Sequence, residues 1–306
     1  MLQDERIASL ETLVGRDVGR NIQELVRGAS GGLLRAARSI AEHPEPTSVL
    51  VTGVFMPWAN PPAAETDGPI GAAELATGLS RAGWPVRIVT DSRCANAARA
   101  ALDAVEPDHD VPLDVVPDAP DAEDAIESLI AHYRSELRVT HMIAIERLGP
   151  SNDGRVYDML GRDLSATTAP LHRLYAGVDS TRISIGDGGN EIGMGSLAPD
   201  LVANSVSLGA RIHCVVPCDH LIVSGISNWG AQALLASVAI LRQGSTDELL
   251  SGLLPERQIA IIRETVLNGP AVDGVTQTQE FSVDGLAGPT HVQMVEKILA
   301  VARNRA

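Results

Sequence analysis

Two kinds of apolar run alternate along most of the chain. Six short runs rich in β-branched and other apolar residues predict strands at 48–53, 86–90, 111–116, 141–145, 182–185 and 211–216. Apolar residues at helical spacing predict helices over 71–82, 94–105, 122–137, 228–242 and 289–303. Because strands that alternate with helices form right-handed βαβ units, we expect an α/β protein with three Rossmann-like layers, in which helices cover both faces of a mostly parallel sheet.

The first part of the chain follows a different pattern. Ile7, Leu10 and Val14 recur at helical spacing, and a second helical stretch begins near Leu33. The prolines at 44 and 46 end this part, because a residue before proline is driven out of the helical conformation. We expect a single α/β domain over 1–306, in which an N-terminal helical segment at 1–45 precedes the α/β part at 46–306.

Composition narrows the class of partner. The chain has 306 residues, of which 44% are hydrophobic and 3% aromatic, and its net charge is −15. A surface this acidic disfavours nucleic acid and anionic membranes as partners. Three cysteines give no disulfide framework, and the chain shows neither a secretory signal nor an apolar run of about 18 residues. We therefore expect a cytoplasmic protein that acts on a small molecule.

Residues 184–195 form the most informative segment. Five glycines there surround Asp187, Asn190 and Glu191, directly after the run at 182–185. Glycine lets a ligand approach the backbone closely, and ligands of open α/β sheets bind at the carboxyl ends of strands. The segment lacks the Gly-Lys-Ser/Thr of a phosphate loop and misses the dinucleotide spacing. We expect a strand, a tight turn and the start of a helix at a binding site; a glycine-rich turn with a capping Asp is the alternative.

Polar residues follow other predicted strands as well, and a parallel sheet brings such loops to one rim. Each of these loops also has a plain structural interpretation as a helix cap, a turn or a local ion pair. We interpret Asp273-Gly274 and Asp284-Gly285 as turns. The binding candidates on the rim are Glu65, Asp67 and Gly68 after the first strand, Glu146 and Arg147 after the fourth, and Asp219, His220, Ser227 and Asn228 after the sixth.

The sequence gives weaker evidence for a bound metal ion than for a small-molecule site. The spacing of Cys214 and Cys218 is not that of a structural zinc site. An oxygen-ligated Mg²⁺ or Mn²⁺ held by Asp67, Asp187 and Glu191 is the better metal hypothesis, and a site without metal stays open. The sequence shows no pattern typical of a covalent nucleophile.

The motifs at 65–69, 146–157, 185–195 and 218–230 together resemble the C-terminal domain of D-glutamate cyclases. The resemblance runs in order from about residue 50 to the end of the chain. It implies a lyase that converts D-glutamate into 5-oxo-D-proline and water. The vertebrate enzyme of the family resembles a fusion of two domains and this chain matches only the second, so a separate partner domain is one expectation and a homodimer another.

The implied reaction joins the substrate amine to its own γ-carboxyl carbon, which requires a base, an acid and positive groups near the carboxylates. On this hypothesis Asp187 is the base, Glu191 or His220 is the acid, and Arg147 binds a substrate carboxylate. The N–H groups of Gly188, Gly189 and Asn190, at a helix start, would hold an anion. Glu65 and Asp67 would hold the ammonium group or a metal.

Two other classes of function remain open from the sequence. One is a non-catalytic module that binds an amino acid or carboxylate and needs a partner domain. The other is a metal-dependent hydrolase or lyase that acts on a different small acid.

Overall fold

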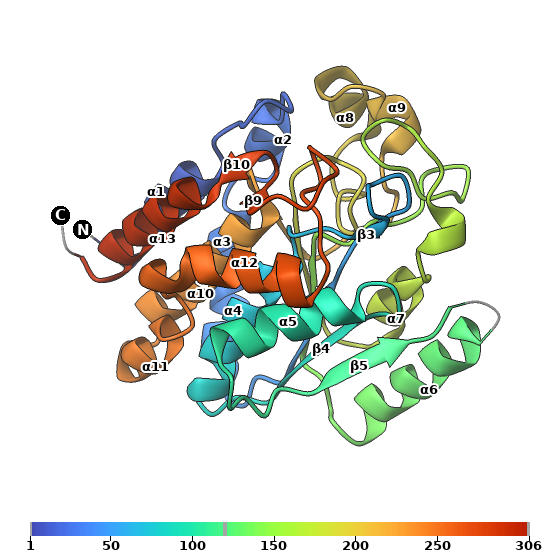
Figure 1. Ribbon diagram of the computed structural model, residues 1–306. Helices are drawn as coiled ribbons and strands as arrows, with labels where there is room; N and C mark the ends of the chain where they lie inside the picture. The colour runs from blue at the N-terminus through green and yellow to red at the C-terminus, as the bar shows by residue number, and fades with distance from the viewer. Residues whose placement is uncertain (1, 119–120, 305–306) are drawn as a thin grey trace.

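The computed structural model describes residues 2–118 and 121–304. Its centre is a six-stranded sheet with the order β5-β4-β1-β6-β7-β8, in which every neighbouring pair is parallel. The prediction of an α/β protein with a parallel Rossmann-like sheet is confirmed (Figure 1). The strands are β1 (Ser48–Thr52), β4 (Val86–Asp91), β5 (Leu113–Val116), β6 (His141–Ile145), β7 (Thr181–Gly186) and β8 (His220–Val223).

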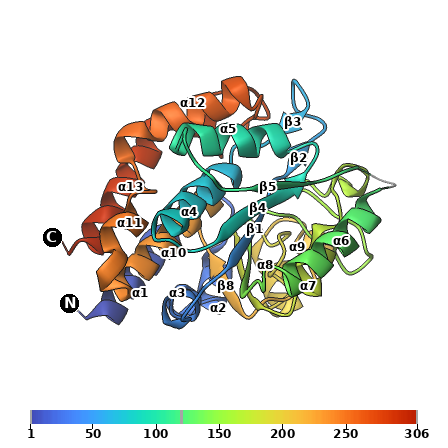
Figure 2. The same ribbon diagram turned by 90° about the horizontal axis from the view of Figure 1, so that it is seen from below.

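Helices cover both faces of the sheet (Figure 2). Alternate side chains of β1 explain the two cores: Leu50 belongs to one apolar cluster, whereas Val49 and Val51 belong to another. On the face of Leu50 lie α4 (Pro69–Arg81), α5 (Ala95–Val105) and α10 (Ser227–Leu241). On the opposite face lie α6 (Ala122–Ser135) and α7 (Leu171–Gly177).

The predicted N-terminal helical segment is confirmed and packs on the α/β part. It consists of α1 (Gln3–Val14), α2 (Gln23–Gly28) and α3 (Gly32–Glu42). Ile7 and Leu10 of α1 are fully buried in the same cluster as α10 and the C-terminal helix α13 (Gly288–Ala302). Because α1 is fixed there, the loop between α1 and α2 can reach the carboxyl end of the sheet.

The remaining elements are short or peripheral. They are β2 (Phe55–Met56), β3 (Ala63–Ala64), α8 (Pro199–Ser205), α9 (Gly209–Ile212), α11 (Thr246–Leu250), α12 (Gln258–Asn268), the hairpin strands β9 (Ser282–Val283) and β10 (Leu286–Ala287), and three 3₁₀ turns at Ser165–Thr167, Gln243–Ser245 and Pro255–Arg257. None of the helices in the described ranges has the length and apolar character needed to cross a bilayer.

The strand predicted at 211–216 is wrong. Its first residues end α9, and the rest is extended chain whose hydrogen bonds go to the glycine-rich loop: the N–H of Cys214 donates to Gly189, and Val216 accepts from Gly193 and Gly195. The alternating apolar residues therefore pack beneath that loop and do not enter the sheet. The sixth strand is β8, which begins at His220.

A buried polar cluster joins three helices behind the sheet. Glu74 of α4 is fully buried and accepts hydrogen bonds from the side-chain amides of Gln232 on α10 and Gln258 on α12. Burial raises the pKa of Glu74 to about 7, even though the two amides favour the charged form. The folded protein therefore holds a proton here that the unfolded chain releases at much lower pH.

We expect Glu74→Gln to remove a pH dependence of stability. Between the ordinary pKa of 4.5 and the folded value of about 7, the native state binds more protons than the unfolded state, so the wild type loses stability as pH rises, by about 3 kcal/mol in total. The oxygen of the Gln232 amide has no partner within the described residues, so it can turn to accept from the new amide. Urea denaturation at about pH 5 and about pH 8 measures the effect. Glu296→Gln, at an exposed site of α13, is the control, and an equal pH dependence in all three proteins would contradict the prediction.

Candidate functional site

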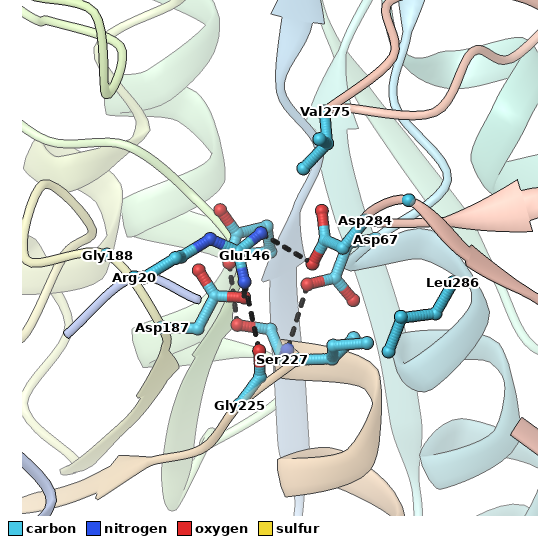
Figure 3. Close-up of polar contacts among 12 residues, drawn as sticks. Arg20, Asp67, Glu146, Asp187, Gly188, Gly225, Ser227, Val275, Asp284 and Leu286 are labelled. Carbon is cyan, nitrogen blue, oxygen red and sulfur yellow. Dashed lines mark hydrogen bonds and ion pairs between the residues drawn. The ribbon is translucent and has the colours of Figure 1, made fainter. Parts of the chain in front are cut away.

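Buried carboxylates from several segments meet at the carboxyl end of the sheet. Glu146 follows β6 and Asp187 follows β7, whereas Glu65 and Asp67 precede α4 and Asp284 lies in the turn between β9 and β10. Parallel strands place their carboxyl ends on one edge, which is why residues so far apart in the chain converge there. Figure 3 shows Asp67, Glu146, Asp187 and Asp284 around a common centre.

A single guanidinium lies at the middle of this cluster. Arg20, from the loop between α1 and α2, is 3.1 Å from an oxygen of Asp187 and 2.8 Å from an oxygen of Asp284. It also donates to the backbone carbonyl of Gly225 at 2.9 Å. The N-terminal segment and the C-terminal hairpin are thus tied to each other through the site. Neither Arg20 nor Asp284 was predicted: the segment at 1–45 showed only helical periodicity, and Asp284-Gly285 has the pattern of an ordinary turn.

Two helices exchange capping groups beside the cluster. The carboxylate of Asp67 accepts from the backbone N–H groups of Ser227 and Asn228, each at 2.8 Å, at the start of α10. In return, the side-chain oxygen of Asn228 accepts from the N–H groups of Gly68 and Gly71, at 2.9 and 2.7 Å, at the start of α4. Asn228 is therefore a helix cap, but it caps α4 and not α10, the helix to which it belongs. Each cap satisfies helix N–H groups that lack intrahelical partners and faces the positive end of a helix dipole.

Two backbone conformations at the rim are unusual. Gly68 has φ +94°, and a Cβ atom there would lie 2.7 Å from the hydroxyl of Thr52. Glu146 has φ 42°, in a region that non-glycine residues rarely adopt. Its carboxylate accepts from the hydroxyl of Ser227 at 2.6 Å. The turn after β6 thus holds the Glu146 side chain toward the start of α10.

Two of the three N–H groups of the expected anion cradle, those of Gly188 and Gly189, are occupied by the chain itself. Glu191 accepts from the N–H groups of Asp187 and Gly188 at 2.6 and 2.5 Å, and from Gly189 at 2.7 Å. No helix starts here, because turns and isolated bridges follow β7 until α8 begins. The prediction of a helix start is therefore wrong, and these N–H groups are not free for a substrate anion. Glu191 shapes the loop that presents Asp187.

Burial and mutual repulsion raise the pKa values on one side of the cluster. Burial raises the pKa of Asp67 to about 8, and Asp284 adds to this, whereas the N–H groups of Asn228 and Ser227 act against it. Burial, Asp284 and Asp67 likewise raise the pKa of Glu65 well above its usual range. Several of these groups cannot all be ionised together without a further positive charge.

Glu146 and Asp187 differ in their electrostatic neighbours. Burial and the neighbouring Asp187 and Glu191 raise the pKa of Glu146. Burial also raises the pKa of Asp187, but the guanidinium of Arg20 acts against that rise. Although burial opposes its charge, Arg20 has a pKa above its usual range because Asp187 and Asp284 face it. Of the two carboxylates, Asp187 is therefore the one better stabilised in its ionised form.

A cavity of about 280 Å³ opens onto the cluster. This is small for a ligand pocket and suits a molecule the size of an amino acid. Its apolar lining consists of Val54, Met56, Leu148, Met159, Leu160, Val275 and Gly274. Its polar lining consists of Arg20, Glu65, Glu146, Asp158, Arg162, Asp187, Asn190, Gln277 and Asp284.

Arg147 does not contact this cavity. Its side chain is 1% exposed and forms an ion pair with Asp91 at 2.7 Å, while also donating to the carbonyls of Gly53 and Ala169. Arg147 follows β6, and its guanidinium points away from the cavity and joins the segments that contain Asp91, Gly53 and Ala169. The structure therefore does not support the expectation that Arg147 binds a substrate carboxylate.

Asp219 and His220 lie at the other end of the sheet. Because β8 begins at His220, both residues are at the amino end of a parallel strand, whereas the cluster is at the carboxyl end. The side chain of Asp219 accepts from the backbone N–H of Arg182, at the start of β7. Their assignment to the site followed from the misplaced strand at 211–216 and is corrected here.

Two carboxylate sets have the geometry to hold a cation. Asp67, Asp187 and Asp284 offer oxygen atoms within 4.8 Å of one another, and so do Glu146, Asp187 and Glu191. Hard divalent cations such as Mg²⁺ and Mn²⁺ prefer such oxygen ligands. The structure thus divides the predicted set of Asp67, Asp187 and Glu191 between two groups that share Asp187.

Comparison with known proteins identifies the family of this chain. The model of a family described as D-glutamate cyclase-like, C-terminal, matches residues 10–299. The chain is 30% identical over 333 residues to human "D-glutamate cyclase, mitochondrial". The match covers 97% of this chain but 52% of the human protein, so the chain spans about half the length of that relative.

Proposed function

Because the chain belongs to the D-glutamate cyclase-like C-terminal family, we propose that it is a lyase that converts D-glutamate into 5-oxo-D-proline and water at the cavity beside Arg20. The observation that carries the proposal is the excess of buried carboxylates over cations in a cavity of amino-acid size. An ammonium group fits there because it supplies the positive charge that the cluster lacks.

The geometry supports Asp187 as the base. Like Asp284, it is paired with Arg20 and has an Oδ2 without a hydrogen-bond partner within the described residues; unlike Asp284, it directly follows a strand of the central sheet. An incoming ammonium group can therefore give its proton to Asp187 and leave a neutral amine. That amine attacks the γ-carboxyl carbon of the same molecule, a step whose rate depends mainly on holding the folded-back conformer.

Glu146 replaces His220 and Glu191 as the proposed acid. His220 lies at the far end of the sheet, and Glu191 is held by three backbone N–H groups. Burial and the neighbouring carboxylates raise the pKa of Glu146, which favours its protonated form. Glu146 would donate its proton to the departing oxygen. The nitrogen loses two protons in all, one to Asp187 before its attack and one afterwards, and the departing oxygen gains two protons and leaves as water.

Arg20 has two proposed tasks. It acts against the rise in the pKa of Asp187 that burial causes, which favours the ionised form that a base requires, and its guanidinium provides positive charge where the tetrahedral intermediate develops an oxyanion. Mg²⁺ or Mn²⁺ at Asp67, Asp187 and Asp284 is a further proposal that the carboxylate geometry supports; such an ion would polarise a carboxyl oxygen.

A binding module is the second candidate function. The chain spans about half of the human relative, so that a site which binds D-glutamate here could require a partner domain for turnover. The same excess of buried carboxylates supports binding of an ammonium group in either case.

Proton NMR of the purified protein with D-glutamate, L-glutamate and 5-oxo-D-proline tests the proposal. We expect conversion between D-glutamate and 5-oxo-D-proline and none of L-glutamate, with parallel samples containing EDTA, Mg²⁺ or Mn²⁺ to decide the role of a metal. Line broadening of D-glutamate without conversion would favour the binding module. Absence of both signals would reject D-glutamate as the ligand.

A further inference from the structure

Arg162 is a second guanidinium on the cavity wall, and neither the resemblance nor the carboxylate cluster assigns it a role. Among the described residues, Arg20 and Arg162 are the two cations that line this cavity. They differ in surroundings: the side chain of Arg20 is 16% exposed and faces two carboxylates of the cluster, whereas that of Arg162 is 28% exposed and belongs to the loop after β6. Arg162 thus lies on the outer, more accessible side of the cavity.

The local fold holds Arg162 in one position before any ligand arrives. Asp158 accepts from the backbone N–H groups of Leu160 and Arg162 at 3.0 and 2.8 Å, and its second oxygen accepts from Nε of Arg162 at 2.6 Å. The indole of Trp58 stacks on the guanidinium, with its centroid 4.4 Å from Cζ. A side chain fixed in this way loses little conformational freedom when it binds a ligand.

Most of the hydrogen-bonding capacity of Arg162 is unused. Within the part of the chain that the structure describes, Nε is the one side-chain nitrogen with an acceptor, and one terminal nitrogen is buried with no partner at all. A guanidinium with its terminal N–H groups free is suited to bind a carboxylate through two parallel hydrogen bonds. In contrast, Arg20 already donates to a carbonyl and faces two carboxylates.

We propose that Arg162 binds the α-carboxylate of the amino-acid substrate, the carboxylate that does not react. This inference rests on the proposed function. With the amine at Asp187 and the γ-carboxyl group beside Glu146, the α-carboxylate is the third group of the substrate and needs a cation outside the acidic cluster. In a cavity of about 280 Å³, one amino acid contacts both walls.

It follows from this placement that Arg162 distinguishes D-glutamate from L-glutamate by the configuration at the α-carbon. Recognition of handedness needs three separate contacts, and the carboxylate cluster alone supplies two of them, for the amine and for the γ-carboxyl group. When these two are held, the enantiomer directs its α-carboxylate away from Arg162 and leaves the terminal N–H groups of the guanidinium without a ligand acceptor. Arg162 is therefore a specificity-determining residue and takes no part in proton transfer.

The test compares Arg162→Gln with the wild type, with three ligands titrated by calorimetry: D-glutamate, L-glutamate and 4-aminobutyrate. The last has the same amine and carboxyl spacing as glutamate but lacks the α-carboxylate. We expect the variant to bind D-glutamate about 10- to 100-fold more weakly, as loss of a charged hydrogen-bonding partner predicts, and 4-aminobutyrate within about twofold of the wild type. The preference for D- over L-glutamate should fall by a similar factor, and KM should rise more than kcat falls.

Arg155→Gln is the matched control, because Arg155 belongs to the same loop, has a 60% exposed side chain and does not line the cavity. Equal weakening of D-glutamate and 4-aminobutyrate in Arg162→Gln would overturn the inference, as would a variant that keeps the wild-type preference for D-glutamate. Failure of the proposed function gives a different result: the wild type then binds D-glutamate without converting it, and the affinities still decide the role of Arg162. A wild type that binds none of the three ligands would overturn both.

Discussion

Arg20→Gln is expected to destabilise the folded protein by about 3 kcal/mol near neutral pH, as the loss of one partner from a buried ion pair does. Arg20 pairs with Asp187 and Asp284 at 3.1 and 2.8 Å, and both carboxylates are buried. Glutamine can still donate to the carbonyl of Gly225, but it supplies no positive charge. Urea denaturation followed by circular dichroism measures the change in the free energy of unfolding.

The pH dependence separates this effect from a loss of packing. Arg20 acts against the rise in the pKa of Asp187 that burial causes, so its removal raises that pKa further. An acid whose pKa is higher in the folded than in the unfolded state loses stability as pH rises from the unfolded value through the folded value. The deficit of Arg20→Gln should therefore be small at acid pH, where the carboxylates are protonated, and should grow as pH rises.

Arg38→Gln provides the control for the N-terminal segment. Arg38 pairs with Asp4 on the surface, and both side chains are about half exposed. Because exposed pairs contribute at most about 1 kcal/mol, this variant should unfold almost as the wild type does at every pH. A deficit of Arg20→Gln that is the same at acid and alkaline pH would contradict the electrostatic explanation and indicate lost packing alone.

Local patterns in the sequence predicted the scaffold well. The five strands from β1 to β7 in the central sheet coincide with predicted runs, because residues that pack on a covered face of a sheet are apolar. The one wrong strand, at 211–216, has the same alternating pattern, but its apolar residues pack against the glycine-rich loop. Periodicity reports which residues are buried and not the partner that buries them.

The site was only partly predictable for a related reason. Glu65, Asp67, Glu146 and Asp187 follow strands or a glycine-rich turn, so that the rule for parallel sheets locates them. Arg20 reaches the same point from a loop between two helices, and no local pattern distinguishes it from other surface arginines. The structure also shows that a glycine-rich loop can be closed by its own chain, since Glu191 occupies two of the three N–H groups that the sequence analysis assigned to a ligand, those of Gly188 and Gly189.

Asp187→Asn is expected to lower the conversion of D-glutamate by about 10²- to 10⁴-fold, the usual contribution of a general base. Asparagine has nearly the same shape as aspartate but cannot accept the ammonium proton. The fold should survive, because Arg20 keeps its pair with Asp284 and the cluster loses one of its repelling charges. Thermal denaturation and the affinity for D-glutamate, measured together with turnover, check that the change acts on the chemical step.

The matched control is Asp200→Asn, at an exposed position in the first turn of α8 and outside the cavity. It should retain wild-type turnover and affinity. The assignment of the base depends on the comparison of these two variants, because both replace an aspartate by asparagine in the segment between β7 and β8. Turnover of folded Asp187→Asn equal to that of the wild type would exclude Asp187 as the base, and Glu65, whose pKa burial also raises and which lines the same cavity, would then be the carboxylate to test.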